Sequence, residues 1–174
     1  MKTRKSYLTE VDLTAFTTTD DREGERTEVD VSTPPDEGKI ARILADRFQG
    51  TFPQMPPDFS AKKVDGRRAY ATARQGGKPR LEARDVVVHH IRLLPYAWPM
   101  ATIEVICEKG FYVRSLARDL GRILGTGGHC ASIRRTAVGP FTLDEATDPE
   151  TLPTPVPAHV VIPTSVALGR LETA

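Results

Sequence analysis

The segment from Phe111 to Leu124 constrains the fold more than any other part of the chain. Its apolar residues recur three and four positions apart, which places them along one side of an α-helix. Three glycines, at positions 125, 127 and 128, follow at once and provide a stop signal. We therefore expect an amphipathic helix whose apolar side is formed by Val113, Leu116, Ala117, Leu120, Ile123 and Leu124.

Strand signals occur on both sides of this helix. Runs rich in β-branched residues, or alternating between apolar and polar residues, predict strands at 6–15, 26–31, 61–64, 86–94, 101–107 and 131–138. The runs 86–94 and 101–107 are separated by a short proline-containing loop, so we expect them to pair as antiparallel neighbours.

Helix and loop signals account for most of the remaining chain. Pro34 and Pro35 open a helical pattern that ends at Gly50, and a shorter helix is predicted at 67–75. Three prolines between residues 51 and 60 predict an irregular loop. Strands and helices that alternate irregularly predict an α+β domain with a mixed, mostly antiparallel sheet and flanking helices.

Length and composition favour one compact domain without disulfides. The chain has 174 residues, of which 39% are hydrophobic. Its two cysteines, Cys107 and Cys130, are too few for a disulfide scaffold and lack metal-ligand spacing, so we expect no zinc site and a reducing cytoplasm. Residues 1–5 are charged, and no stretch approaches the roughly 18–20 apolar residues of a membrane span. We therefore expect a soluble, cytoplasmic protein.

Charge is unevenly distributed along the chain. The net charge is only +1, but residues 61–136 carry 15 Lys plus Arg against 6 Asp plus Glu, a net of +9. The flanking residues together carry a net charge of −8. A basic segment of this size suits contact with a polyanion such as RNA or DNA, and the alternative is a solvated charged face.

Several motifs resemble one known family. The stretches Glu108–Gly121, Gly127–Thr136 and Val138–Phe141 closely resemble the signature of the B-type pseudouridine synthases, the TruB family. Further matches follow the same order, at Lys5–Tyr7 with Thr17–Gly24, Phe48–Gly50 with Pro53–Pro57, and Ser60–Tyr70 with Ala73–Gly76. The resemblance implies a partial pseudouridine synthase catalytic domain at residues 1–147, followed by a proline-rich tail at 148–174.

The resemblance also implies an activity and a partner. It implies a tRNA pseudouridine-55 synthase, which isomerises a uridine of the tRNA T-loop to pseudouridine without a cofactor or metal. Such chemistry needs the base outside the RNA stack, held between aromatic or apolar side chains, while the stem is held by its phosphates. The expected partner is therefore tRNA, through its T-loop and stem, with no role for DNA or membranes.

Three residues match catalytic positions of the family. Tyr7 resembles the active-site tyrosine, whose ring lies against the flipped base. Arg114 falls at the position of a buried arginine that pairs with the catalytic carboxylate, and Tyr112 lies two residues before it in the same motif. Without the resemblance, Tyr7 would be interpreted as a core residue, and Arg114 as a surface arginine with a local ion pair.

A larger set is expected to contact the substrate. Ile133 matches an apolar position that lines the base pocket, and Lys109 matches a pocket lysine; the alternatives are a core residue and a solvated charge. The other expected contacts lie in the basic segment: Lys62, Lys63, Arg67, Arg68, Tyr70, Arg74, Arg134 and Arg135.

The family's nucleophilic aspartate has no counterpart in these residues. The family carries it in a Gly-His-x-Gly-Thr-Leu-Asp-Pro motif upstream of the position of Tyr7, and the 174 residues contain no such motif. We do not expect Asp20 or Asp21 to replace it, so Arg114 is predicted to lack its carboxylate partner and to tolerate replacement by methionine. Three alternatives follow: a fragment of an ordinary synthase, half of a split enzyme completed by a separate chain, or a noncatalytic RNA-binding relative.

Overall fold

The computed structural model describes residues 3–59, 63–64, 67–68 and 81–172, and for residues 63, 64, 67 and 68 only the backbone. The strands are β1 Lys5–Asp12, β2 Ala15–Thr17, β3 Arg26–Glu28, β4 Gly50–Gln54, β5 Lys63–Val64, β6 Arg67–Arg68, β7 Arg84–Leu93, β8 Met100–Cys107, β9 His129–Val138 and β10 Phe141–Thr142. The α-helices are α1 Glu37–Phe48, α3 Val113–Leu124 and α4 Thr164–Glu172, and 3-10 turns occur at Leu143–Glu145, Pro149–Thr151 and Ala158–Val160.

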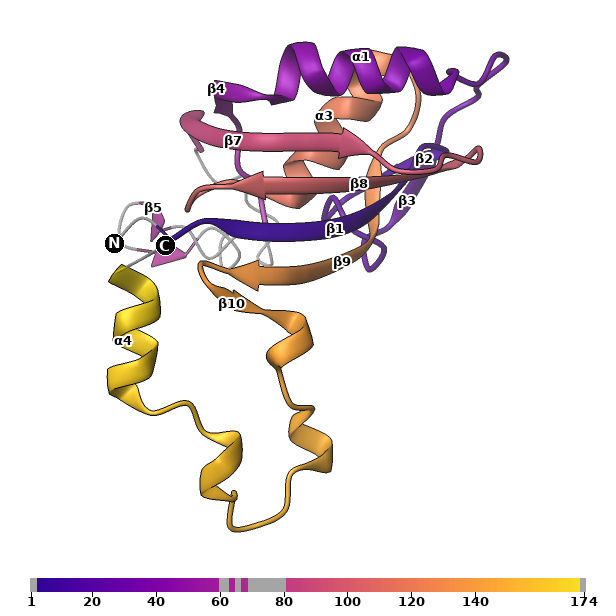
Figure 1. Ribbon diagram of the computed structural model, residues 1–174. Coiled ribbons are helices and arrows are strands. Elements are labelled where there is room, and N and C mark those ends of the chain that lie inside the picture. The colour runs from indigo at the N-terminus through magenta and orange to yellow at the C-terminus, as the bar shows by residue number, and fades with distance from the viewer. Residues whose placement is uncertain (1–2, 60–62, 65–66, 69–80, 173–174) are drawn as a thin grey trace.

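One six-stranded sheet organises the molecule (Figure 1). Its strand order is β10-β9-β1-β8-β7-β4, and all of its ladders are antiparallel. The N-terminal strand β1 lies near the centre, where Tyr7 faces Val105 of β8 on one side and Arg135 of β9 on the other. The hairpins β2-β3 and β5-β6 form two separate two-stranded sheets. The predicted α+β class and mostly antiparallel sheet are confirmed.

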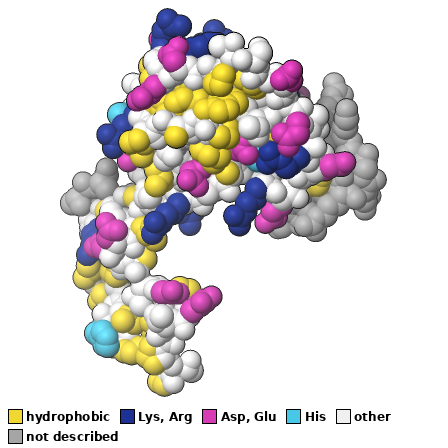
Figure 2. Space-filling view, turned by 90° about the vertical axis from the view of Figure 1, so that its right-hand side faces the viewer, with side chains coloured by type: hydrophobic (Ala, Val, Ile, Leu, Met, Phe, Trp, Pro, Cys, Tyr) yellow, Lys and Arg dark blue, Asp and Glu magenta, His cyan; other side chains and the backbone are white. Residues whose placement is uncertain are grey.

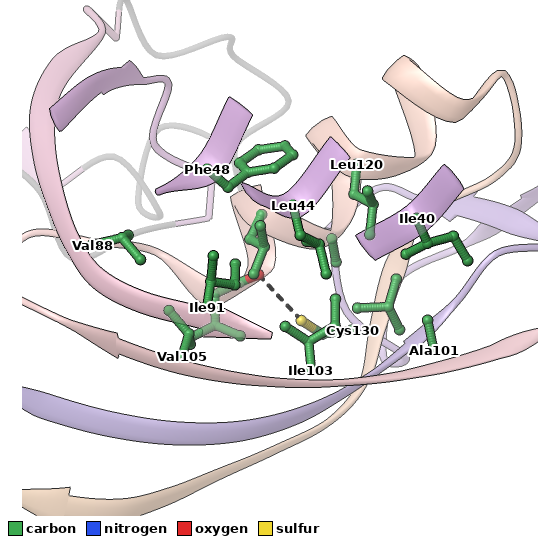
Figure 3. Packing of buried hydrophobic residues seen from close by; sticks show 14 of the residues in the cluster. Ile40, Leu44, Phe48, Val88, Ile91, Ala101, Ile103, Val105, Leu120 and Cys130 are labelled. Atoms are coloured by element: carbon green, nitrogen blue, oxygen red, sulfur yellow. Dashed lines mark hydrogen bonds between the residues drawn. The ribbon is translucent and has the colours of Figure 1, made fainter. Parts of the chain in front are cut away.

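The hydrophobic core lies between one face of the sheet and the helices α1 and α3 (Figures 1 and 3). Ile40, Leu44 and Phe48 of α1 are buried at the spacing that the sequence predicted. The helix α3 begins at Val113, two residues after the predicted start at Phe111, and is capped as expected by Gly125, which takes the left-handed backbone conformation with φ of 75°. The Cys130 thiol of β9 reaches the Val113 carbonyl oxygen of α3 at 3.5 Å, a bond drawn in Figure 3.

The second face of the sheet carries polar pairs between neighbouring strands. Arg92 Nε of β7 donates to Glu104 Oε2 of β8 at 2.7 Å, and Ser132 Oγ of β9 donates to Glu10 Oε2 of β1 at 2.8 Å. Because strand side chains alternate between faces, these residues point away from the core that α1 and α3 cover. This face is therefore stabilised by cross-strand polar contacts.

Two local predictions were wrong. The segment expected to be an irregular loop because of its prolines includes β4, where Pro53 lies opposite Asp85 of β7. Proline is tolerated there because β4 is the last strand of the sheet, so the missing N–H interrupts no ladder on its outer side. Arg67 and Arg68, predicted as the start of a helix, form strand β6 instead, and residues 69–75 of that helix lie outside the described part of the chain.

The C-terminal residues form an arm that leaves the sheet and returns through α4 (Figure 1). Arg170 of α4 donates to Glu145 at 2.8 Å and lies over the Phe141 ring, with 5.8 Å to its centroid. Figure 2 shows apolar side chains along the arm. The most exposed of them are Val156, Val161, Val166 and Leu168. The predicted domain boundary at residue 147 stays a prediction. Within the described ranges, no helix has the length and apolar character to cross a membrane.

Candidate active site

Arg114 lies in the first turn of α3 and is held by the loop that precedes β3. Its Nη1 donates to Asp21 Oδ2 at 3.0 Å and to the Thr19 carbonyl oxygen at 3.1 Å, while its Nη2 donates to the Phe59 carbonyl oxygen at 2.9 Å. The prediction that Arg114 would lack a carboxylate partner is therefore wrong. The loop folds back over a separation of 93 residues, and this brings Asp21 to the start of α3.

The backbone of the loop at 17–24 is fixed to the beginning of β9. The Cys130 N–H donates to the Asp20 carbonyl oxygen and the Arg22 N–H donates to the Cys130 carbonyl oxygen, each at 3.0 Å. The hydroxyl of Thr19 donates to the Asp21 carboxylate. These bonds contribute to the position of Asp21 without involving Arg114.

A second arginine of α3 holds the same loop. Arg118 is only 7% exposed, and its Nη1 donates to Asp20 Oδ2 at 2.8 Å. Its Nε donates to Asp119 at 2.8 Å and its Nη2 to the Met55 carbonyl oxygen at 2.9 Å. Burial raises the pKa of Asp20, although the charge of Arg118 acts in the opposite direction. Burial disfavours the charge of Arg118, but Asp119 and Asp20 outweigh this effect and raise its pKa.

Ile133 borders a hollow beside Asp21. The hollow has a volume of about 320 Å³ and is lined by Asp21, Arg22, Glu23, Ala131, Ser132 and Ile133. Ile133 is 45% exposed, which excludes the alternative that it is a core residue. An exposed apolar side chain that shares a hollow with Asp21 is suited to contact with a planar base.

Tyr7 lies half-buried on β1, with its ring against the hydrophobic core. Burial raises the pKa of Tyr7 and the neighbouring Cys107 adds to the effect, while a hydrogen bond and the charge of Arg135 lower it. Arg134 and Arg135 are both exposed on β9, next to β1. The structure thus brings two of the predicted substrate contacts to the strand that carries Tyr7.

Lys109 and Tyr112 line a different hollow. Its volume is about 520 Å³, and its lining residues are Gln54, Pro56, Arg84, Asp85, Val86, Lys109, Gly110 and Tyr112. Tyr112 is the residue that directly precedes α3, so this hollow borders the same helix start as Arg114. Predicted site residues therefore gather around the first turn of α3 and along β1 and β9.

Gln54, a residue that the sequence interpretation missed, holds Tyr112 in place. Its side chain is buried, with a residue exposure of 2%, and its two polar atoms bind the backbone of Tyr112. The Tyr112 N–H donates to Gln54 Oε1 at 2.8 Å, and Gln54 Nε2 donates to the Tyr112 carbonyl oxygen at 3.1 Å. The available signal was an amide side chain within a proline-rich segment that matches the family.

Replacing Gln54 with leucine should destabilise the domain. The change leaves the N–H and the carbonyl of Tyr112 without the amide that pairs with them, at a cost of about 2–3 kcal/mol in free energy of unfolding. Urea denaturation measures the difference. Gln49→Leu is the matched control because Gln49 is exposed, and it should change stability by less than about 0.5 kcal/mol. Equal stability of the two variants would contradict the proposed role of Gln54.

Several predicted contacts cannot be placed. Lys62, Tyr70 and Arg74 lie outside the described residues. The backbones of Lys63, Arg67 and Arg68 form the β5-β6 hairpin, but their side chains are outside the described part of the chain. Their contact with RNA stays a prediction.

Comparisons with known proteins identify the family. Residues 1–113 match the model of the TruB family pseudouridylate synthase (N terminal domain), and residues 114–154 match that of the tRNA pseudouridylate synthase B C-terminal domain. The two matches meet inside α3, which packs in one core with β1 and β9.

Curated relatives agree with these matches. The chain is 47% identical over 149 residues to the tRNA pseudouridine synthase B of Dinoroseobacter shibae, covering 85% of this chain and 48% of that protein. It is 45% identical over 158 residues to the synthase of the same name from Corynebacterium diphtheriae, covering 85% and 51%. The chain thus spans about half the length of these relatives.

A crystal structure of a Cbf5-Nop10-Gar1 complex contains a similar fold, with a TM-score of 0.56 and 25% identity over 82% of this chain and 32% of that one. The motifs around Arg114, the matches along the chain and the shared fold lead to one conclusion: the chain belongs to the TruB family of pseudouridylate synthases.

Proposed function

We propose that this chain contributes the part of a tRNA pseudouridine synthase active site that holds the target uridine and orients the nucleophile. The observation that carries the proposal is that Arg114 pairs with Asp21, which itself lines the hollow bordered by Ile133. In this proposal Tyr7 and Ile133 contact the base. Tyr112 and Lys109 line the separate hollow at the start of α3.

Arg114 has the capacity to bind a second carboxylate. Its bonds to Asp21, Thr19 and Phe59 use three of the five N–H groups of a guanidinium, counting only partners in the described ranges. A guanidinium stays charged when partly buried and keeps a neighbouring carboxylate ionised, as a nucleophilic aspartate requires. We propose that this aspartate comes from residues beyond these 174, either in the same polypeptide or in a separate chain.

The proposed substrate is the T-loop of tRNA, and the proposed place of action is the cytoplasm. The family match and the exposed Arg134 and Arg135 on β9 support an RNA partner, since arginines contact phosphates without reading sequence. The isomerisation moves one glycosidic bond within the substrate, so the proposal requires neither a cofactor nor a metal.

Complementation with a nucleophile-bearing segment tests the activity. The 174-residue chain is mixed with a T-arm RNA hairpin, alone and together with a segment that carries the family's Gly-His-x-Gly-Thr-Leu-Asp-Pro motif. Pseudouridine is then measured by nucleoside analysis. We expect conversion only with the added segment, and none when its motif aspartate is changed to asparagine, because covalent catalysis needs the carboxylate.

Measuring how tightly the chain binds the same T-arm hairpin distinguishes the remaining alternatives. Binding of the T-arm hairpin without turnover under every condition would favour a noncatalytic RNA-binding relative. Absence of T-arm binding would refute the proposal. If Arg134 and Arg135 bind phosphates, changing both to glutamine reduces the slope of log K against log salt concentration by about 0.7–0.9 for each phosphate that is no longer neutralised. Arg42→Gln, at an exposed position of α1, should leave this slope unchanged.

A further inference from the structure

Two consecutive aspartates of the 17–24 loop meet two arginines of α3. Asp20 pairs with Arg118 at 2.8 Å and Asp21 pairs with Arg114 at 3.0 Å. The arginines are four positions apart, so they project from one side of the helix, roughly one turn from each other. Asp20 has a φ of 60°, a conformation that aspartate adopts more readily than most residues. The loop and the helix are therefore joined at two adjacent points.

The two ion pairs differ in their burial. The side chains of Arg118 and Asp20 are 9% and 13% exposed, against 24% and 25% for Arg114 and Asp21. Arg118 also donates to Asp119 and to the Met55 carbonyl oxygen, and a buried guanidinium needs such acceptors. The more buried pair, in which Arg118 also binds two further acceptors, is suited to act as the fixed point of the loop.

Arg118 and Asp20 do not reach the hollow beside Ile133. They line a separate hollow of about 280 Å³, together with Thr17, Thr18, Met55, Pro56, Asp58 and Arg122. Of the two loop aspartates, only Asp21 lines the hollow that Ile133 borders. Any effect of Arg118 on chemistry at that hollow must therefore pass through the position of the loop.

The segment at 55–59 is tied to the same two arginines. The Met55 carbonyl oxygen accepts from Arg118 Nη2 at 2.9 Å and from Ser115 Oγ at 2.8 Å. The Phe59 carbonyl oxygen accepts from Arg114 Nη2 at 2.9 Å. Arg118 thereby holds both segments that supply hydrogen-bond acceptors to Arg114.

We infer that Arg118 and Asp20 form a positioning pair, which fixes the 17–24 loop so that Asp21 holds Arg114 in one orientation. Arg118 is a positioning residue and does not itself contact the substrate. The relevance of the pair to catalysis rests on the proposed function. The geometric claim, that the pair sets the orientation of Arg114, stands without it.

The guanidinium of Arg114 gives a direct test in the chain without RNA. We expect Asp20→Asn and Arg118→Lys each to raise hydrogen exchange of the Arg114 side-chain N–H groups about tenfold, because local opening of the loop becomes easier. NMR measures this exchange, and amide signals of α3 and β9 report whether the fold persists. Arg47→Lys is the control: Arg47 is exposed on α1 and belongs to neither ion pair, so the change should leave Arg114 exchange unaltered.

The inference is overturned if Arg114 exchange stays at its original rate in folded Asp20→Asn and Arg118→Lys proteins. Unfolding of both variants would overturn it too, because the pair would then support the whole domain rather than position one loop. In the complemented enzyme, we expect Arg118→Lys to lower kcat with little change in KM or in the salt dependence of RNA binding. If the original chain fails to bind T-arm RNA, the proposed function fails, while the NMR result still decides the positioning role.

Discussion

Arg114→Met is expected to lower the free energy of unfolding by about 2–3 kcal/mol, because it breaks an ion pair and leaves two carbonyl oxygens without their donor. The part-exposed position keeps the effect below that of a fully buried pair, since water partly screens the remaining Asp21 charge. Urea denaturation of both proteins measures the difference. The expectation from sequence, that methionine would be tolerated or stabilising here, is thus reversed by the presence of Asp21.

A double-mutant cycle isolates the contribution of the pair. Asp21→Asn and Arg114→Met should be less than additive when combined, because each removes the same interaction. The complemented enzyme with Arg114→Met should show no conversion of T-arm RNA, since the nucleophile would lose the cation that keeps it ionised. Stability equal to or higher than that of the original chain would mean that the Arg114–Asp21 pair does not form in solution.

The fold was largely predictable for helices and strands that bury only one of their faces. Both α1 and α3 show apolar residues at helical spacing, and β8 alternates between buried and half-buried side chains along its whole length. Local pattern failed at β4, because it records the preference of Pro53 against strands but not the place of that strand at the sheet edge. Strand order is also absent from local pattern: β1 lies between β8 and β9, far from both in sequence.

The candidate site was predictable only in part, because its contacts join segments that are far apart in the sequence. The resemblance identified Arg114, Tyr7 and Ile133, which periodicity alone would have assigned to a helix surface or to the core. The partners of Arg114 depend on contacts between distant segments, since Asp21 is 93 residues away. Gln54 is likewise 58 residues from the backbone that it holds. Neither contact leaves a periodic signal, because both depend on how loops close onto the start of α3.

Gly127, in the turn after α3, lies directly against the backbone of Thr14 and Ala15. A Cβ atom added there would lie within 3.0 Å of backbone atoms of Thr14 and Ala15. The next residue, Gly128, donates its N–H to the Ala15 carbonyl oxygen at 2.9 Å, and His129 Nδ1 lies 2.9 Å from the same oxygen. The turn after α3 therefore rests directly on the backbone that leads into β2 and the 17–24 loop.

Gly127→Ala is expected to destabilise the domain by about 3 kcal/mol or more, because the added methyl group meets backbone, which cannot rotate away as a side chain would. Separating these backbones would also move the loop that carries Asp21, so T-arm binding should weaken along with stability. Thermal unfolding and RNA binding measure the two effects. Gly169→Ala, on α4, is the matched control, because its added Cβ meets no atom within 4 Å, and alanine favours helix. If Gly127→Ala unfolds at the same temperature as the original chain, the close approach of Gly127 to Ala15 does not exist in solution, and the loop that carries Asp21 is held by its bonds to β9 and α3 alone.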